Sequence, residues 1–245
     1  MNFKQLYVRL NNVPALLIFS NSYEKAASCG TVLFYHGLWA SKETNEKELF
    51  DIARQGYLAV GIDCAGHGER QEHNLRDCFS TEGAEKVLQR IIDDTINEIP
   101  GIIDELVRLG LADPQKIGIC GISMGAYIAY GSVIKDKRIR VSTPILGSPV
   151  WKYGNGNSPY DHPEKFFPVA LLAQNAGKDK SVKPEFARKF HEILVPFYKD
   201  APDRLRYVEF PESEHFMREQ DWKILWKNVL NWFNIHLSDR SDYFF

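Results

Sequence analysis

The chain has 245 residues, of which 44% are hydrophobic, and this length is sufficient for one domain with a large buried core. Its 30 basic and 32 acidic residues give a formal net charge of −2, and neither sign forms a long run. The charge pattern therefore argues against a nucleic-acid or anionic-membrane partner and favours a small substrate of neutral or mixed charge.

The cysteines and the N-terminal residues indicate a reduced protein of the cytoplasm. Cys29, Cys64, Cys78 and Cys120 form no C-x-x-C pair, and two of them lie in apolar runs, where a free thiol behaves as a small hydrophobe. The N-terminus, MNFKQLYVRLNN, has no apolar segment with a cleavage site, and no stretch approaches the ~18 apolar residues of a membrane span. We therefore expect a cytoplasmic protein without a membrane partner.

Short apolar runs alternate with helical patterns along most of the chain. Eight strands are predicted, at residues 6–10, 15–19, 31–35, 58–62, 116–120, 144–146, 169–173 and 206–210. Helices are predicted at residues 44–55, 82–109, 124–135, 184–198 and 219–237. This alternation is typical of an α/β fold in which helices cover both faces of a mainly parallel sheet, and a site is expected at the carboxyl ends of its strands.

The two ends of the sheet and the domain boundaries follow from short signals. Asn11, Asn12 and Pro14 join the first two predicted strands in a turn that allows an antiparallel hairpin at one edge. No repeat or linker divides the chain, so we expect a single domain over residues 1–245. The irregular stretch 151–165 is predicted to be a short cap over a pocket.

Residues 121–125, Gly-Ile-Ser-Met-Gly, match the pattern G-x-S-x-G between a predicted strand and a predicted helix. In this context the serine occupies a sharp, strained turn whose neighbouring positions must lack bulk, as Gly121 and Gly125 do. Ser123 is therefore predicted to be an exposed nucleophile, with the amide of Met124 as an oxyanion donor. The alternative is an ordinary glycine-rich turn in which Ser123 caps the helix.

A second oxyanion donor is expected from the loop after strand 31–35, and Leu38 N–H is the candidate. His36 lies at the start of this loop, directly before Gly37. It could act as a base, but its position at a buried strand end favours a structural role in which the ring nitrogens brace the loop.

Several of these segments together resemble a known family: His36-Gly37, Lys42-Glu43, residues 63–70 (DCAGHGER) and the serine turn. They are similar to bacterial esterases of the α/β-hydrolase superfamily, in the branch of the dienelactone hydrolases and prolyl oligopeptidases. The resemblance implies an α/β-hydrolase fold, with an eight-stranded, mostly parallel sheet, helices on both faces and a short cap segment. It also implies that residues 63–68 form a structural loop near the pocket, so that His67 is not catalytic.

The resemblance implies a triad in the order serine, acid, histidine. Asp179 is the candidate acid, because it stands in the loop after strand 169–173, which resembles the acid loop of the family. Asp179 would accept a hydrogen bond from Nδ1 of the histidine and fix its tautomer. Asp200 and Asp203 are the alternatives, although both follow the next helix.

His215 is the candidate base, because it follows strand 206–210 and precedes the last helix, where the family places its histidine. The other histidines outside the loops described above are interpreted as surface or packing residues, with a role for the one in the cap segment left open: His73, His162, His191 and His236. Glu214 and Gln174 depart from the family pattern without removing a catalytic group, and the side chain of Glu214 is expected to be solvated.

These residues predict a serine hydrolase that cleaves a small-molecule carboxylic ester through an acyl-enzyme, with no metal and no organic cofactor. Candidate substrate-binding residues, each of which could equally belong to the core, are Trp39, Trp151, Tyr153 and Phe216. The short cap favours small, soluble esters with short acyl chains. Peptide, thioester and lactone bonds are the alternatives, followed by a catalytically inactive binding protein of the same fold.

The last predicted helix, 219–237, carries an apolar face that includes Trp222, Leu225 and Phe233. We expect this face to pack on the sheet. The alternative is a homodimer interface.

Overall fold

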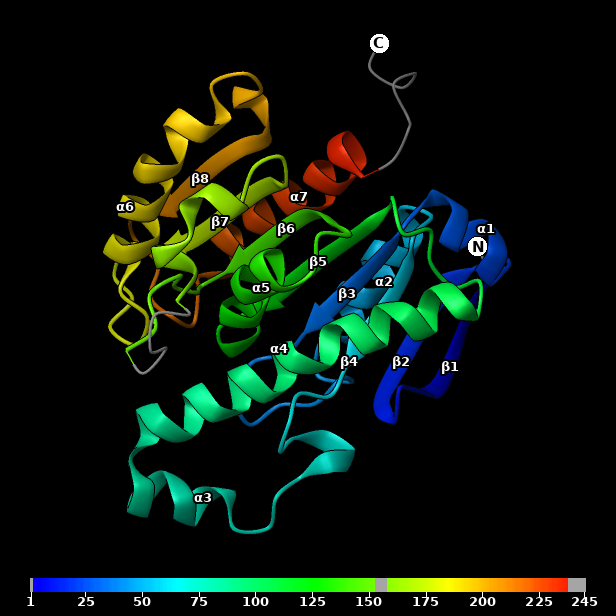
Figure 1. Cartoon of the computed structure of the whole chain (residues 1–245), viewed down its shortest axis with the longest axis horizontal. Coiled ribbons are helices and arrows are strands. Elements are labelled where there is room, and N and C mark those ends of the chain that lie inside the picture. Colours follow the sequence, from blue (N-terminus) through cyan, green and yellow to red (C-terminus); the bar gives the residue numbers. More distant parts are fainter. Residues whose placement is uncertain (1, 153–157, 238–245) are drawn as a thin grey trace.

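The computed structural model describes residues 2–152 and 158–237, and it shows a twisted sheet with helices on both faces (Figure 1). The eight strands lie in the order β1-β2-β4-β3-β5-β6-β7-β8. Their bounds are β1 (Phe3–Leu10), β2 (Val13–Ser20), β3 (Thr31–Tyr35), β4 (Leu58–Ile62), β5 (Ile117–Ile122), β6 (Ile139–Ile145), β7 (Ala170–Ala176) and β8 (Leu205–Phe210). The predicted eight-stranded sheet is confirmed.

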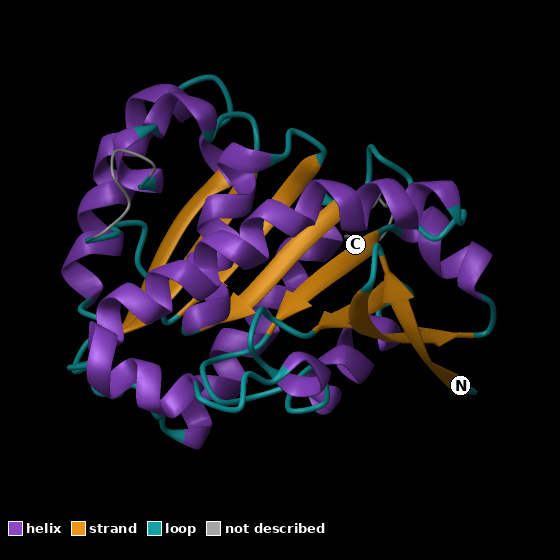
Figure 2. Cartoon of the chain, turned by 60° about the horizontal axis from the view of Figure 1, so that its bottom comes forward, coloured by secondary structure: helices purple, strands orange, loops and turns teal. Residues whose placement is uncertain are grey.

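The sheet changes from antiparallel to parallel near its first edge. β1 and β2 form the predicted antiparallel hairpin, and β2 also pairs antiparallel with β4. All remaining neighbours are parallel, so the carboxyl ends of six strands lie at one edge of the sheet. The arrows of the central strands point the same way in Figure 2. This edge is where a site is expected in a parallel α/β sheet.

Seven α-helices are found among the described residues. Their bounds are α1 (Tyr23–Cys29), α2 (Glu46–Arg54), α3 (Leu75–Cys78), α4 (Ala84–Arg108), α5 (Met124–Lys135), α6 (Pro184–Leu194) and α7 (Glu219–His236). The apolar residues of α4, α5 and α6 belong to one buried cluster, and those of α2 and α7 belong to a second cluster. The sheet is therefore covered on both faces, and the apolar face of α7 packs against it.

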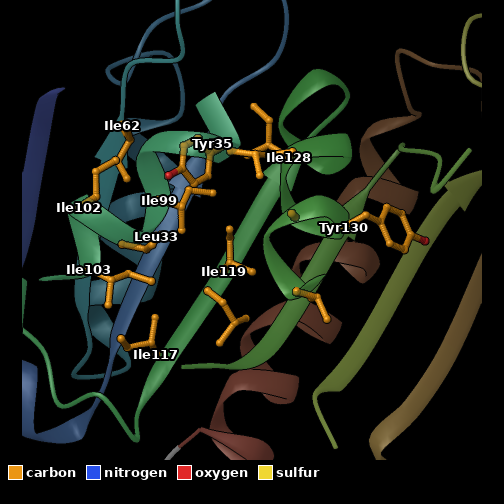
Figure 3. Close-up of a cluster of buried hydrophobic side chains, with 14 of the residues drawn as sticks. Leu33, Tyr35, Ile62, Ile99, Ile102, Ile103, Ile117, Ile119, Ile128 and Tyr130 are labelled. Atoms are coloured by element: carbon orange, nitrogen blue, oxygen red, sulfur yellow. The ribbon is translucent and has the colours of Figure 1, made fainter. Parts of the chain in front are cut away.

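The larger core lies between α4 and the central strands (Figure 3). Ile99, Ile102 and Ile103 of α4 are fully buried, as are Leu33 of β3 and Ile119 of β5. Each such side chain contributes about 1.5–3 kcal/mol to folding through the apolar surface that it removes from water. This packing holds β3 and β5, whose ends carry the candidate oxyanion loop and the candidate nucleophile.

Three regions differ from the predicted elements. The sequence analysis missed α1, a helix of seven residues whose N-cap Ser22 accepts a hydrogen bond from the amide of Lys25. β6 begins earlier than the predicted 144–146, because residues from Ile139 onward pair with β5, and it ends at Ile145, before the positive φ of Leu146. The predicted helix 184–198 ends earlier, at Leu194, and continues as a 3-10 turn.

The irregular segment between β6 and β7 is described in part. It contains two 3-10 turns, Pro159–Asp161 and Pro163–Lys165. Residues 153–157 of the predicted cap lie outside the described residues. Among the helices of the described ranges, none combines the length and the apolar character that a membrane crossing requires.

Three histidines, His36, His67 and His191, are buried, and their burial makes the stability of the fold depend on pH. Burial lowers the pKa of His191 in α6, and that of His36, from 6.5 to about 4. Below pH 6.5 the unfolded chain takes up protons that the folded chain excludes, so stability is lost as the pH falls from 6.5 toward 4. Each histidine contributes up to about 1.4 kcal/mol per pH unit to this slope.

The variant His191→Leu should therefore lose less stability than the wild type between pH 7 and pH 5, as measured by urea denaturation at each pH. The exposed His73 provides a matched control, because His73→Leu should leave the wild-type slope unchanged. Equal slopes for wild type and His191→Leu would show that His191 does not exclude a proton in the folded state.

Candidate active site

Three of the predicted site residues follow three different strands at the carboxyl edge of the sheet. Ser123 follows β5, Asp179 lies in the loop after β7, and His215 lies in the loop between β8 and α7. His215 lies 92 positions after Ser123 and 36 positions after Asp179 in the sequence. They lie close together because β5, β7 and β8 run parallel and end at the same edge of the sheet.

The backbone at Ser123 is strained, and its surroundings leave no space for side chains. Ser123 has φ 55° and ψ −115°, a region that residues with a Cβ rarely adopt. A Cβ on Gly121 would lie 2.0 Å from the carbonyl oxygen of Gly125, and one on Gly125 would lie 2.1 Å from that of Tyr35. Only glycine fits at both positions, so the turn that exposes Ser123 depends on them.

The side chains of Ser123, His215 and Asp179 form one hydrogen-bonded chain. Ser123 Oγ lies 3.1 Å from His215 Nε2, and His215 Nδ1 lies 2.7 Å from Asp179 Oδ2. When Nδ1 donates to the carboxylate, Nε2 carries the lone pair that faces the serine hydroxyl. The arrangement can therefore take the proton of Ser123 and hold the resulting imidazolium beside a negative charge.

The carboxylate of Asp179 is fixed on both of its oxygen atoms. Its side chain is fully buried, and Oδ1 accepts hydrogen bonds from the amides of Ser181 and Val182 at 2.8 and 2.9 Å. Asp203 lies in the 3-10 turn Pro202–Arg204, before the first residue of β8 and so at the opposite edge of the sheet. Of the acids considered from the sequence, the structure brings Asp179 to His215.

The two candidate oxyanion donors, Leu38 and Met124, both line the pocket that contains Ser123. Met124 is the first residue of α5, so its N–H has no acceptor within the helix. Leu38 belongs to the loop after β3, the strand that pairs directly with β5. Both residues therefore lie beside Ser123 in the pocket, and their role as oxyanion donors stays a prediction.

The pocket has a volume of about 620 Å³ and mostly apolar walls. Phe216, predicted as a substrate contact, lines it and is 95% exposed. Apolar wall residues that the sequence analysis did not identify as such are Ala40, Leu88, Ile122, Tyr127, Leu146, Val182, Met217 and Trp222. Val182 and Met217 could have been found from their closeness to Asp179 and His215 in the sequence, whereas Leu88 of α4 carries no such signal.

The structure does not bring the two candidate tryptophans to this pocket. Trp39 lines a neighbouring hollow, where its ring lies 5.0 Å from that of Phe79 and 5.3 Å from the guanidinium of Arg76. Trp151 belongs to the larger hydrophobic core and is only 8% exposed. The ring of Trp39 thus packs on the segment after β4, and the largely buried Trp151 lines a separate hollow that shares Leu88 and Tyr127 with the pocket of Ser123. Substrate contacts of the two tryptophans stay predictions. Tyr153 lies outside the described residues.

His36 contacts backbone groups through both of its ring nitrogens. Nδ1 lies 2.8 Å from the carbonyl oxygen of Gly37, and Nε2 accepts a hydrogen bond of 3.1 Å from the amide of Cys64. Burial lowers the pKa of His36 to about 4, so the ring is neutral at pH 7. These contacts join the loop after β3 to the loop after β4, as the structural interpretation of His36 predicts.

The segment after β4 is organised around the buried carboxylate of Asp63. Its Oδ1 accepts from the amide of Lys42 at 2.9 Å, and its Oδ2 accepts from Lys42 Nζ and from the amide of Glu69, both at 3.0 Å. His67 is buried, and its Nδ1 lies 2.9 Å from the carbonyl oxygen of Ala65. Neither His67 nor Asp63 lines the pocket of Ser123, and their contacts are those of a structural loop.

Two further observations concern the residues around the site. Glu214, directly before His215, is exposed, and Gln174 is buried in β7, where its amide donates to the carbonyl of Leu225. Within residues 2–152 and 158–237, no three His, Cys, Asp or Glu side chains gather in an arrangement that could hold a metal ion.

Comparison with known proteins gives one curated relative and many similar structures. A protein of Bacillus subtilis (strain 168) named "Putative esterase YitV" is 25% identical over 214 residues, which cover 75% of this chain and 82% of that protein. A structure named "Putative Dienelactone Hydrolase" from Klebsiella pneumoniae has a TM-score of 0.76 at 16% identity and covers 96% of this chain and 99% of its own.

The acylaminoacyl peptidase of Pyrococcus horikoshii has a TM-score of 0.75 at 18% identity, over all of this chain and 44% of its own. The structure named as a dienelactone hydrolase and the one named as an acylaminoacyl peptidase therefore both share the fold of this chain. The family described as serine aminopeptidase, S33, matches residues 26–182, which is more than half of the chain and includes Ser123 and Asp179. The chain belongs to this S33 family of α/β-hydrolases.

Proposed function

We propose that this hydrolase cleaves carboxylic esters through an acyl-enzyme, with Ser123 as nucleophile, His215 as general base and acid, and Asp179 as the group that orients His215. The observation that carries the proposal is the hydrogen-bonded chain of 3.1 and 2.7 Å that ends on a serine in a strained turn. Such strain is stored where a reactive group must be exposed. The curated relative named as an esterase supports the choice of bond.

The proposed reaction has two steps. Ser123 Oγ attacks the acyl carbon while His215 Nε2 takes its proton, and the carbonyl oxygen becomes an oxyanion that accepts hydrogen bonds from the amides of Leu38 and Met124. His215 then gives the proton to the leaving alcohol. In the second step His215 takes a proton from water, whose oxygen attacks the acyl-enzyme, and returns it to Ser123 as the acid leaves.

The walls of the pocket favour an uncharged substrate of modest size. A volume of about 620 Å³ accommodates a short acyl chain together with a small alcohol, and walls such as Leu146 and Tyr127 offer apolar contacts. A charged group buried against these walls without a partner would lose its hydration. The proposed substrates are therefore neutral esters with short acyl chains.

The first test is hydrolysis of p-nitrophenyl acetate and butyrate by the wild-type protein, together with covalent labelling by a fluorophosphonate. We expect turnover of both esters, one fluorophosphonate adduct on Ser123, and slower turnover of p-nitrophenyl palmitate. Faster cleavage of leucine p-nitroanilide than of the esters would make the protein an aminopeptidase instead. A folded protein that neither turns over nor labels would be a binding protein of the same fold.

A further inference from the structure

The loop that carries His215 is attached to two other elements through one buried residue. Ser213 stands two positions before His215 and is fully buried. Its amide donates to the carbonyl of Phe210 at 3.1 Å, which closes the turn after β8. Its carbonyl accepts from the amide of Lys178 at 2.9 Å, which links it to the loop that carries Asp179. The backbone of Ser213 thus joins the histidine loop to the acid loop.

The side chain of Ser213 makes a third link, to the start of α7. Its Oγ donates to Asp221 Oδ2 at 2.6 Å and accepts from the amide of Arg218 at 3.3 Å. Asp221 is 7% exposed and also accepts from Arg218 Nε at 2.9 Å. A carboxylate in the first turn of a helix is stabilised by the free amides there. The end of the histidine loop is therefore fixed to the first turn of α7 on both sides of His215.

The two loops also touch through their backbones. The amide of Gly177 donates to the carbonyl of Phe210 at 2.8 Å, and a Cβ on Gly177 would lie 2.8 Å from the Cα of Pro211. No side chain fits between the acid loop and the histidine loop at this point. Backbone contacts therefore join the histidine loop to the acid loop, and the Ser213 hydroxyl joins the histidine loop to the start of α7.

We infer that Ser213 and Asp221 are positioning residues, which hold His215 in the orientation that lets it contact Asp179 and Ser123 at the same time. The inference rests on the proposed roles of these three residues. Ser213 and Asp221 act through the loop and touch no substrate atom. Misplacement of a catalytic group by about 1 Å can cost about 100-fold in rate, so a hydroxyl that fixes this loop can matter as much as a direct contact.

The variant Ser213→Ala tests the inference, because it keeps both backbone links and removes only the hydroxyl bonds to Asp221 and from Arg218. We expect kcat for p-nitrophenyl butyrate to fall by roughly 10-fold to 100-fold with little change in KM. We also expect the low-field proton resonance of His215 Nδ1–H, assigned by its loss in His215→Ala, to broaden or disappear.

Two control variants separate positioning from a loss of stability or charge. Ser142→Ala removes another fully buried serine hydroxyl, on β6, and should keep the kcat and the resonance of the wild type. Asp221→Asn keeps an oxygen that can accept from Ser213, and it should retain far more activity than Asp221→Ala. Equal losses in these two Asp221 variants would mean that the charge, rather than the contact with Ser213, is what matters, and would overturn the inference.

The resonance keeps this test separate from the test of the proposed function. If the wild type is inert toward esters and fluorophosphonate but its resonance is lost in Ser213→Ala and kept in Ser142→Ala, the proposed function fails and the positioning role stands. If Ser213→Ala keeps both the resonance and kcat, or if Ser142→Ala loses as much, the positioning role is wrong. A wild type without the resonance would also overturn it.

Discussion

Replacing Ser123 with alanine is expected to lower kcat for p-nitrophenyl butyrate by a factor on the order of 10⁴ to 10⁶, because the attacking oxygen is removed while His215 and Asp179 stay in place. Labelling by a fluorophosphonate should be lost as well. Release of p-nitrophenolate, followed by absorbance, measures the first effect, and intact-protein mass measures the second.

Ser132 provides the matched control for this variant. It lies on the same helix, α5, and is fully buried, with its Oγ donating to the carbonyl of Ile128 at 2.6 Å. Ser132→Ala should therefore keep kcat and labelling close to those of the wild type, even if some stability is lost. Activity that survives in Ser123→Ala at the wild-type level would place the nucleophile elsewhere.

The largest effect on stability is expected for Lys42→Met. The side chain of Lys42 is 2% exposed, and its Nζ lies 3.0 Å from Asp63 Oδ2, 2.8 Å from Glu69 Oε1 and 2.9 Å from Glu43 Oε1. Burial opposes its charge, but the hydrogen bonds to these three carboxylates raise the pKa of Lys42 overall. Methionine fills a similar volume and leaves the fully buried carboxylate of Asp63 without its cation, which should cost about 3–5 kcal/mol in the free energy of unfolding.

A lysine in a surface ion pair is the natural comparison. Lys223 pairs with Glu219 one turn away on α7, and their side chains are 70% and 83% exposed. Exposed pairs contribute only about 0–1 kcal/mol, so Lys223→Met should have little effect in the same urea titration. If Lys42→Met lost no more stability than Lys223→Met, the buried charges around Asp63 would not hold the loop together.

Much of the fold could be predicted because its strongest signals are local. The apolar runs of the central strands and the long apolar periodicity of α4 come from burial, and burial is what sequence patterns record. Short elements such as α1 and α3 were not predicted, because a helix of one or two turns is stabilised by its neighbours rather than by its own pattern.

In the candidate site too, some residues could be predicted from local patterns and others could not. Ser123, Asp179 and His215 each follow a strand that could be identified, so their convergence could be expected from the parallel order alone. The pocket walls could not, because they come from several elements whose side-chain directions depend on packing. Trp39 is an example. It directly follows the candidate donor Leu38, but its backbone has a positive φ of 65° and its ring lines a different hollow from that of Ser123.

The supporting residues were harder still to identify. Ser213 and Asp221 lie within a few positions of His215, but a serine and an aspartate near a helix start are common in any sequence. Only the three-dimensional contacts show that this serine joins two loops and a helix.

The strained turn at Ser123 also limits how stable this protein can be while it keeps its activity. A backbone with φ 55° and ψ −115° costs about 1–3 kcal/mol for a residue that carries a Cβ, and glycine would relieve that cost. A glycine at position 123 would therefore be expected to stabilise the fold and to remove the proposed nucleophile. The proposed enzyme retains a serine where its own backbone would be more stable with glycine, so any engineering for thermal tolerance has to find its gains in other parts of the chain.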